Sequence, residues 1–235
     1  MEQRAENDKE RSKQMKVIDS KIEPLTKIDG DKILLNLQRA AKTCYKSYKT
    51  TDDVESAKRI VKNLINSNHH AMLEFETITM NYTTNIATIK DCSRHRLGSF
   101  AIESSRFCNY SNGKFGNEIK FLRPIEIPQD TIKYQVWLNA MEQAEKNYMD
   151  MAALGGKPDE LSLMLPQSTA CEMTISCNLR EWRHILALRA VGTTGKPRAC
   201  VQEIMIPTLE MFHKEIPIVF DDVYNKMVAE KQKQR

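Results

Sequence analysis

The feature that most constrains the fold is a repeated change in the spacing of apolar residues along the chain. Residues 78–82 and 173–177 alternate apolar and polar side chains, the period of a half-buried strand. A further short strand is expected around Ile119 and Phe121, before Pro124. Segments between these strands repeat every three to four residues, as amphipathic helices do. Strands interleaved with helices predict an α+β or α/β domain.

The predicted helices cover 31–44, 54–65, 86–96, 131–154, 179–189, 201–212 and 221–228. Thr50 and Asp53 form a capping-box pattern ahead of the second helix, and Asn178 is a suitable cap for the fifth. The third helix is expected to carry Arg94, His95 and Arg96 in its last turn. No internal repeat or Gly/Ser-rich linker interrupts the chain, so we expect a single domain.

Composition narrows the class of protein. The 235 residues are 41% hydrophobic and 28% charged, with a net charge of only +4, which is typical of a globular protein and not of a bulk nucleic-acid binder. Six scattered cysteines without a CxxC pair, and the lack of a signal peptide or membrane-spanning run, predict reduced thiols in the cytoplasm. We expect a charged flexible extension at 1–14, a folded domain at 15–228 and a charged tail at 229–235.

The densest chemistry lies in the segment that holds Arg94, His95 and Arg96, followed by Ser104, Ser105 and Arg106. Guanidinium forks, small side chains and free backbone donors suit phosphate or the oxygen edge of a heterocycle. The flanking positive charge should favour neutral His95. For Arg-His-Arg alone, an exposed basic helix end would be the preferred interpretation.

A second cluster opens the helix at 179–189. Asn178, Arg180 and His184 place free N–H groups and positive charge at the start of a helix, which favours an anionic or carbonyl-rich ligand. We expect Glu181 and Arg183 on the solvated face. Arg189 falls on the apolar side, with Trp182 and Leu186, which a solvated face does not explain.

A third cluster, His69, His70 and Glu74, lies just before the strand at 78–82. Adjacent histidines on an extended chain point to opposite sides, and no partner cluster has zinc spacing. This segment alone indicates a polar turn, and we expect no metal site in the protein.

These three clusters together resemble the flavin-dependent thymidylate synthase family. The signature RHR-x7-S fits Arg94, His95, Arg96 and Ser104 without gaps, and N-x-R…L-R fits Asn178, Arg180 and Arg189. Residues 159–166 are similar to the family's D/E-E-A-R-x-x-L-P. Three positions depart from the pattern: Phe75 replaces a histidine, Ile102 a glutamine and Ser162 an arginine that helps to hold the nucleotide. Lys157 and Lys196 are candidates to compensate for Ser162.

The resemblance implies a homotetramer with active sites shared between subunits, each protomer having a central, mostly antiparallel sheet flanked by helices. It implies methylation of dUMP to dTMP, with methylenetetrahydrofolate as carbon donor and NADPH to reduce FAD. In this family no enzyme thiol attacks the pyrimidine, so the cysteines need no catalytic role.

The resemblance also implies a role for each matched residue. The FAD site would be lined by Glu74, His69, His70, Arg94, His95, Arg96, Asn178, Arg180 and His184. The dUMP phosphate would contact Ser104, Ser105 and Arg106, with Asp91 nearby. Arg189 would bind the uracil ring and act as the catalytic residue.

Two other interpretations are open. Ser162 and Ile102 are compatible with a relative that binds FAD or a nucleotide but has lost methylation. An RNA-binding module could use the arginines as a basic patch, but the chain lacks interleaved aromatic residues beside them. Neither nucleic acid nor a membrane is an expected partner.

Overall fold

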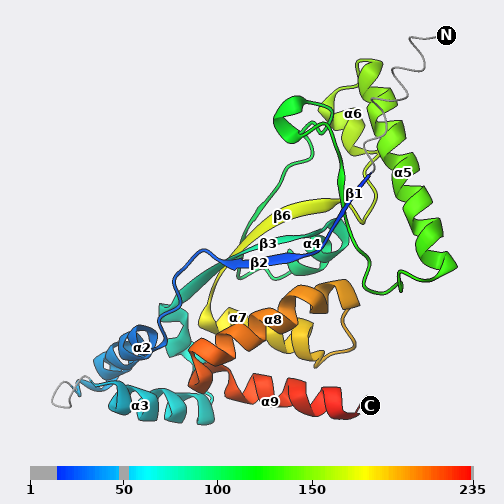
Figure 1. The fold of residues 1–235 in the computed structure, drawn as a ribbon. Coiled ribbons are helices and arrows are strands. Elements are labelled where there is room, and N and C mark those ends of the chain that lie inside the picture. Colours follow the sequence, from blue (N-terminus) through cyan, green and yellow to red (C-terminus); the bar gives the residue numbers. More distant parts are fainter. Residues whose placement is uncertain (1–14, 48–52, 234–235) are drawn as a thin grey trace, which may run out of the picture. The chain divides into compact units, whose positions relative to one another are not determined.

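The computed structural model describes residues 15–47 and 53–233, which form two compact units (Figure 1). Of the described residues, one unit comprises 15–19 and 103–171, and the other comprises 20–47, 53–102 and 172–233. They are called the smaller and the larger unit below. The predicted domain limits at residues 15 and 228 stay a prediction.

The larger unit is built on a four-stranded sheet of order β2-β3-β6-β4. Its strands are β2 (Lys21–Pro24), β3 (Thr77–Asn85), β6 (Ala170–Asn178) and β4 (Ser99–Ile102). β2 pairs with β3 and β4 pairs with β6, both antiparallel. The strands predicted at 78–82 and 173–177 therefore form the centre of this sheet, as β3 and β6.

The alternation within β3 separates the two faces of the sheet. Ile78, Met80 and Tyr82 are fully buried. Side chains on the other face join β3 to β6 through Thr79 Oγ1 and Ser176 Oγ at 2.9 Å, and through Thr174 Oγ1 donating to Asn81 at 2.8 Å. Moving along β3 from Thr79 to Asn81, the bonded residue in β6 moves back from Ser176 to Thr174. The two strands therefore run antiparallel.

Helices cover the apolar face of the sheet (Figure 1). Tyr82 Oη lies 3.1 Å from Thr208 Oγ1, and Trp182 Nε1 donates to the Ile78 carbonyl oxygen at 2.9 Å. These contacts fix α7 (Leu179–Leu186) and α8 (Ala199–Glu215) against β3. The helices and helical turns of this unit are α2 (Gly30–Tyr45), α3 (Val54–Asn66), η1 (His70–Phe75), α4 (Ile86–Cys92), α7 (Leu179–Leu186), η3 (Ala187–Val191), α8 (Ala199–Glu215) and α9 (Pro217–Lys233).

Most predicted helix starts agree with the observed caps. Asp53 Oδ1 accepts from Ser56 N and caps α3, while Asn178 Oδ1 accepts from Glu181 N and caps α7. Thr50, the other half of the predicted capping box, lies outside the described residues. α9 starts four residues earlier than expected and runs to Lys233, so the predicted tail at 229–235 begins within this helix.

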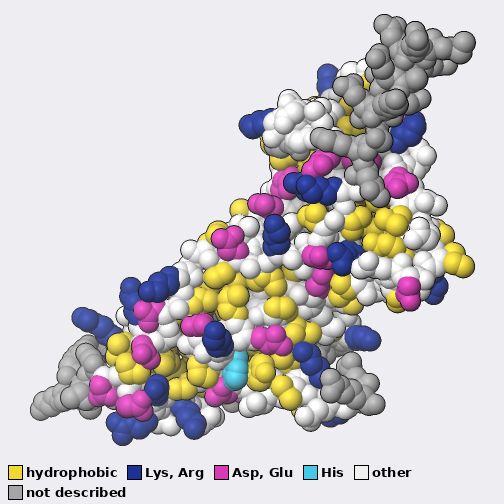
Figure 2. Space-filling model, viewed as in Figure 1, with side chains coloured by type: hydrophobic (Ala, Val, Ile, Leu, Met, Phe, Trp, Pro, Cys, Tyr) yellow, Lys and Arg dark blue, Asp and Glu magenta, His cyan; other side chains and the backbone are white. Residues whose placement is uncertain are grey.

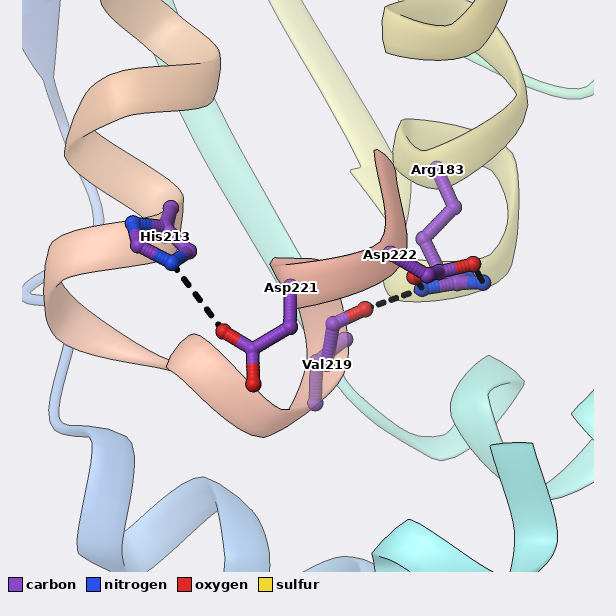
Figure 3. Close-up of polar contacts among 5 residues, drawn as sticks. All are labelled: Arg183, His213, Val219, Asp221 and Asp222. Atoms are coloured by element: carbon purple, nitrogen blue, oxygen red, sulfur yellow. Dashed lines mark hydrogen bonds and ion pairs between the residues drawn. The ribbon is translucent and has the colours of Figure 1, made fainter. Parts of the chain in front are cut away.

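An ion pair links α7 to α9 (Figure 3). Arg183 Nη1 and Nη2 donate to the two carboxylate oxygens of Asp222 at 2.7 and 2.8 Å, and Nη1 also donates to the Val219 carbonyl oxygen. The Arg183 side chain is only 9% exposed. The expectation of a solvated Arg183 was wrong, because α9 packs over this face of α7 and supplies the counter-charge.

The smaller unit contains a parallel pair of short strands, β1 (Lys16–Ile18) and β5 (Lys120–Leu122), and the helices α5 (Ile132–Ala153) and α6 (Pro158–Ser162). A short turn, η2 (Gly113–Phe115), precedes β5. Its core gathers the buried side chains of Ile119, Phe121, Met141, Tyr148 and Leu161.

Together these elements confirm the predicted α+β class with a mostly antiparallel sheet flanked by helices. The strands β1, β2 and β4 were not predicted, because segments of three or four residues carry too little periodicity. Within the described ranges, no helix is both long and apolar enough to cross a membrane.

Candidate active site

His95 lies at the centre of a buried polar cluster in the larger unit. α4 ends at Cys92, and His95 N donates to the Cys92 carbonyl oxygen at 3.1 Å in the turn that follows. The prediction that residues 94–96 form the last turn of this helix was therefore wrong. Because the helix ends at Cys92, His95 lies in a turn and its side chain is buried, while Arg94 and Arg96 are exposed.

Arg189 reaches the same cluster from η3, where the helix begun by α7 widens into a π-helical segment. Arg189 Nε donates to His95 Nε2 at 3.1 Å, and Nη2 donates to the Asp91 carbonyl oxygen at 3.0 Å. π-helical segments are frequent at functional sites. The structure thus brings together Asp91, His95 and Arg189, which the sequence placed in three different roles.

His95 is neutral, as the sequence predicted, but the cause of its lowered pKa differs from the predicted cause. Burial, together with the nearby positive charges of Arg189 and His184, lowers the pKa of His95 from 6.5 to about 4. The exposed Arg94 and Arg96 were the expected cause. Neutral His95 can accept the hydrogen bond from Arg189, which a protonated imidazole could not.

Glu181 completes this cluster, so its expected place on the solvated face was wrong. Its carboxylate Oε1 lies 3.6 Å from His95 Nδ1, and both side chains are almost fully buried. Burial raises the Glu181 pKa. No signal in the sequence would have found it, because helical spacing says which residues share a face and not what packs against that face.

His184 is the exposed neighbour of this cluster. Its ring stands edge-on to that of His95, with centroids 5.8 Å apart. The ligand atoms of His95, Glu181 and His184 lie within 4.8 Å of one another, which is the composition of a metal site. A metal on His95 Nδ1 would require the proton to move to Nε2, where it would face the Arg189 N–H. The donor chemistry therefore does not fit a metal ion while Arg189 keeps its bond to His95.

Other predicted flavin residues line a separate part of the larger unit. A pocket of about 310 Å³ is lined by residues that include His69, His70, Met72 and Arg180. His70 Nε2 is buried without a hydrogen-bond partner in the described part of the chain, and burial lowers the His70 pKa. Arg180 Nη1 donates to Glu74 Oε1 at 2.6 Å beside it. The pocket thus has apolar walls and one exposed cation, and one of its lining residues, His70, has a buried Nε2.

The predicted phosphate residues lie in the smaller unit. Ser104 begins a turn in which its carbonyl oxygen accepts from Phe107 N and Cys108 N. Arg106 Nε donates to Asp159 Oδ1 at 2.7 Å, in an exposed ion pair. Ser162 Oγ donates to the Asp159 carbonyl oxygen at 2.7 Å. Asp159 is a second residue that sequence reasoning left without a role, although it belongs to the 159–166 motif.

The remaining departures from the family pattern are on the surface. Phe75 at the end of η1 is 67% exposed, and Ile102 on the edge strand β4 is 40% exposed. None of the six cysteines, all of which lie in the described ranges, forms a disulfide. Burial raises the pKa of Cys92 and of Cys177 to about 12, so neither is a ready nucleophile.

Comparison with known proteins finds flavin-dependent thymidylate synthases among the relatives of this chain. A flavin-dependent thymidylate synthase from Corynebacterium glutamicum is 23% identical over 227 residues, which cover 89% of this chain and 86% of that protein. One from Pyrococcus abyssi is 27% identical over 146 residues, 59% of this chain and 55% of that enzyme.

A solved structure of similar fold is that of the UMP/dUMP methylase PolB from Streptomyces cacaoi, bound with 5-Br UMP. Its TM-score is 0.71 at 18% identity, covering 91% of this chain and 97% of that one. The family model described as thymidylate synthase complementing protein matches residues 31–218. Since that match spans most of the chain, this protein belongs to the family of flavin-dependent thymidylate synthases that its Arg-His-Arg and serine signature predicted.

Proposed function

We propose that this protein methylates dUMP at carbon 5 to give dTMP, with methylenetetrahydrofolate as carbon donor, FAD as cofactor and NADPH as reductant. The observation that carries the proposal is Arg189, which is fixed by His95 and Asp91 before any substrate binds. These two bonds use Nε and Nη2, and within the described residues Nη1 makes no side-chain hydrogen bond. Arg189 thus has a donor left for a ligand.

A fixed guanidinium suits the chemistry of uracil. Carbon 5 is a poor nucleophile until electron density moves through the ring, and negative charge then grows on the ring oxygens. Arg189 would stabilise that charge without rearranging, which is electrostatic preorganisation. Neutral His95 assists because it accepts from Arg189 and adds no competing positive charge.

The pocket beside His70 has groups that fit a flavin. Apolar walls could cover the face of its ring system, and Arg180 could contact its anionic part. Arg94 and Arg96 are exposed cations for its phosphates. When bound, reduced flavin supplies the hydride that side chains cannot provide. His69, Glu74, Asn178 and His184 complete the proposed flavin site.

For the dUMP phosphate we propose Ser104, the backbone of Ser105, and Arg106. In the structure Arg106 is paired with Asp159, so a phosphate would have to displace or share that pair. The buried, high-pKa thiols of Cys92 and Cys177 support a reaction without an enzyme–pyrimidine thioether. We further propose that four copies assemble and share active sites, as the family resemblance implies.

The test is tritium release from [5-³H]dUMP by purified protein loaded with FAD and given NADPH and methylenetetrahydrofolate, with dTMP identified by chromatography. UMP serves as the competing substrate, since the structurally similar PolB is named a UMP/dUMP methylase. Tritium release with dTMP formation is expected. Bound FAD without tritium release from either nucleotide would favour the relative that has lost methylation, and colourless protein would contradict both.

A further inference from the structure

The contact between Glu181 and His95 has no role in the reaction as proposed so far. Glu181 stands on α7, His95 on the turn after α4, and Arg189 on η3, so the three side chains converge from separate segments. The order of contact is carboxylate, imidazole, guanidinium, with separations of 3.6 Å and then 3.1 Å.

The bond from Arg189 defines the state of His95. Arg189 Nε always carries a hydrogen, so His95 Nε2 must be the acceptor. The single proton of the neutral ring is then on Nδ1, the atom that faces Glu181 Oε1. A carboxylate accepts and does not donate, so it favours this tautomer over the alternative.

We propose that Glu181 is a positioning residue: through its contact with His95 it selects the Nδ1–H tautomer and thereby fixes Arg189 for the pyrimidine. The inference rests on the proposed function for its kinetic consequence, but the tautomer itself is a property of the protein alone. Without Glu181, His95 could carry its proton on Nε2, which would face the Arg189 N–H and break their bond.

Burial of Glu181 argues that the contact is specific. Its side chain is 6% exposed and that of His95 is 5% exposed, and an ionisable group is costly to bury unless its surroundings favour it. Arg183, two residues along α7, is already satisfied by Asp222 and Val219. Within the described part of the chain, the charged or titratable groups that contact or act on His95 are Glu181, His184 and Arg189.

The direct test is the tautomer of His95 in the FAD-loaded protein. Nitrogen-15 solid-state NMR of sedimented, [¹⁵N]histidine-labelled protein distinguishes protonated from unprotonated ring nitrogens, and His95→Gln identifies the His95 signals among five histidines. Wild type should show protonated Nδ1. Glu181→Met, which keeps the volume but removes the acceptor, should shift the proton to Nε2. Glu181→Gln is the milder variant, and should give a mixture, since an amide can accept or donate.

The kinetic test separates positioning from damage to the fold. Glu181→Met should lower dTMP turnover roughly 10- to 100-fold, the usual effect of losing a group that orients another ligand, while FAD content stays near that of wild type. In an Arg189→Ala background the same change should have no further effect. Asp221→Asn is the matched control, because it removes the charge of an exposed carboxylate on α9, paired with His213, and leaves the His95 cluster intact.

Three results would overturn the inference: protonated Nε2 in wild type, an unchanged tautomer with normal turnover in Glu181→Met, or one equivalent of Zn²⁺ retained by wild type and lost with Glu181. If wild type shows the expected tautomer but makes no dTMP, the proposed function fails and the tautomer selection by Glu181 stands.

Discussion

At the scale of single residues, the protein depends on how one neutral histidine holds one arginine. Arg189 gains its fixed position from His95 and from the Asp91 carbonyl oxygen. Both partners are acceptors without positive charge, so the full charge of Arg189 is available to a ligand. Arginine suits this task because its planar fork can bind two partners and still present a third nitrogen.

Replacing Arg189 by alanine should therefore remove mainly transition-state stabilisation. We expect a loss of roughly 2.7–4 kcal/mol in barrier lowering, as for removal of an oxyanion donor. Tritium release under saturating dUMP gives the rate, and the flavin absorbance of the purified variant should stay near normal. Full activity in Arg189→Ala would assign Arg189 to packing instead.

Ser162 is the residue where this chain departs furthest from the family's nucleotide site. In the structure it bonds the Asp159 carbonyl oxygen, and Asp159 holds Arg106. An arginine at 162, one helical turn from Asp159, could pair with that carboxylate and release Arg106 for phosphate. Ser162→Arg should then tighten dUMP binding in calorimetry without changing FAD affinity.

Ser162→Lys is the matched control, since it adds charge without the fork and should help less. Weaker dUMP binding by Ser162→Arg would mean that the pocket is shaped around the serine.

The buried His95 also makes stability depend on pH. Its pKa is 6.5 when unfolded and about 4 when folded, so between these values the unfolded chain binds the extra proton. Stability attributable to His95 is therefore present above pH 6.5 and is lost as the pH falls toward 4, up to about 3 kcal/mol. Urea unfolding at pH 7.5, 6 and 5 measures this slope, which should be smaller in His95→Gln.

At the scale of elements, α7 is held at both faces. Trp182 anchors it to β3, and Arg183 anchors it to α9 through Asp222 (Figure 3). This rigid attachment matters because η3, with Arg189, continues directly from α7. The neighbouring acid, Asp221, pairs with His213 at 3.0 Å and is half exposed.

Asp222→Ala should consequently lower the free energy of unfolding by about 1.5–3 kcal/mol, the range for a hydrogen bond to a charged group. It leaves the buried Arg183 with only the Val219 carbonyl oxygen. Asp221→Ala, one residue away, should cost less than about 1 kcal/mol as an exposed pair. Denaturant unfolding at pH 7.5 compares the two, and equal losses would contradict the anchoring role of Arg183.

At the scale of the whole molecule, the exposed apolar side chains of α5 need explanation. Ile132 is 84% exposed and Val136 is 63% exposed, one helical turn apart, and Figure 2 shows hydrophobic side chains at the surface in the region of α5. Adjacent exposed apolar residues on one helix face indicate an interaction surface. This surface supports the proposed homotetramer.

We expect Ile132→Asp with Val136→Asp to shift the protein from a tetramer to smaller species in analytical ultracentrifugation. The matched control is Lys133→Asp with Gln135→Asp, which adds charge at exposed polar positions of the same helix turn. An unchanged tetramer in the first variant would place the interface elsewhere. A shift in the control would show that added charge alone is disruptive.

The sequence by itself determined the elements and the family. Periodicity located β3, β6, α5 and most other helices. Each of these elements has a buried and an exposed face, so its apolar residues recur at the period of a strand or a helix. The family followed from motifs such as Arg94 to Ser104, whose residues are close in sequence. Short strands such as β4 were not located, because three or four residues are too few to show a period.

Only the tertiary structure decided the contacts between distant residues. Arg189 and His95 are 94 positions apart in the sequence. The residues around Cys92 do not by themselves indicate that the helix ends there and that the His95 side chain is buried. The sequence predicted Glu181 and Arg183 at the surface. Helical spacing indicates which residues share a face of the helix, but not what packs against that face. That is decided by α9 for Arg183 and by the turn at His95 for Glu181, since burial depends on the whole fold.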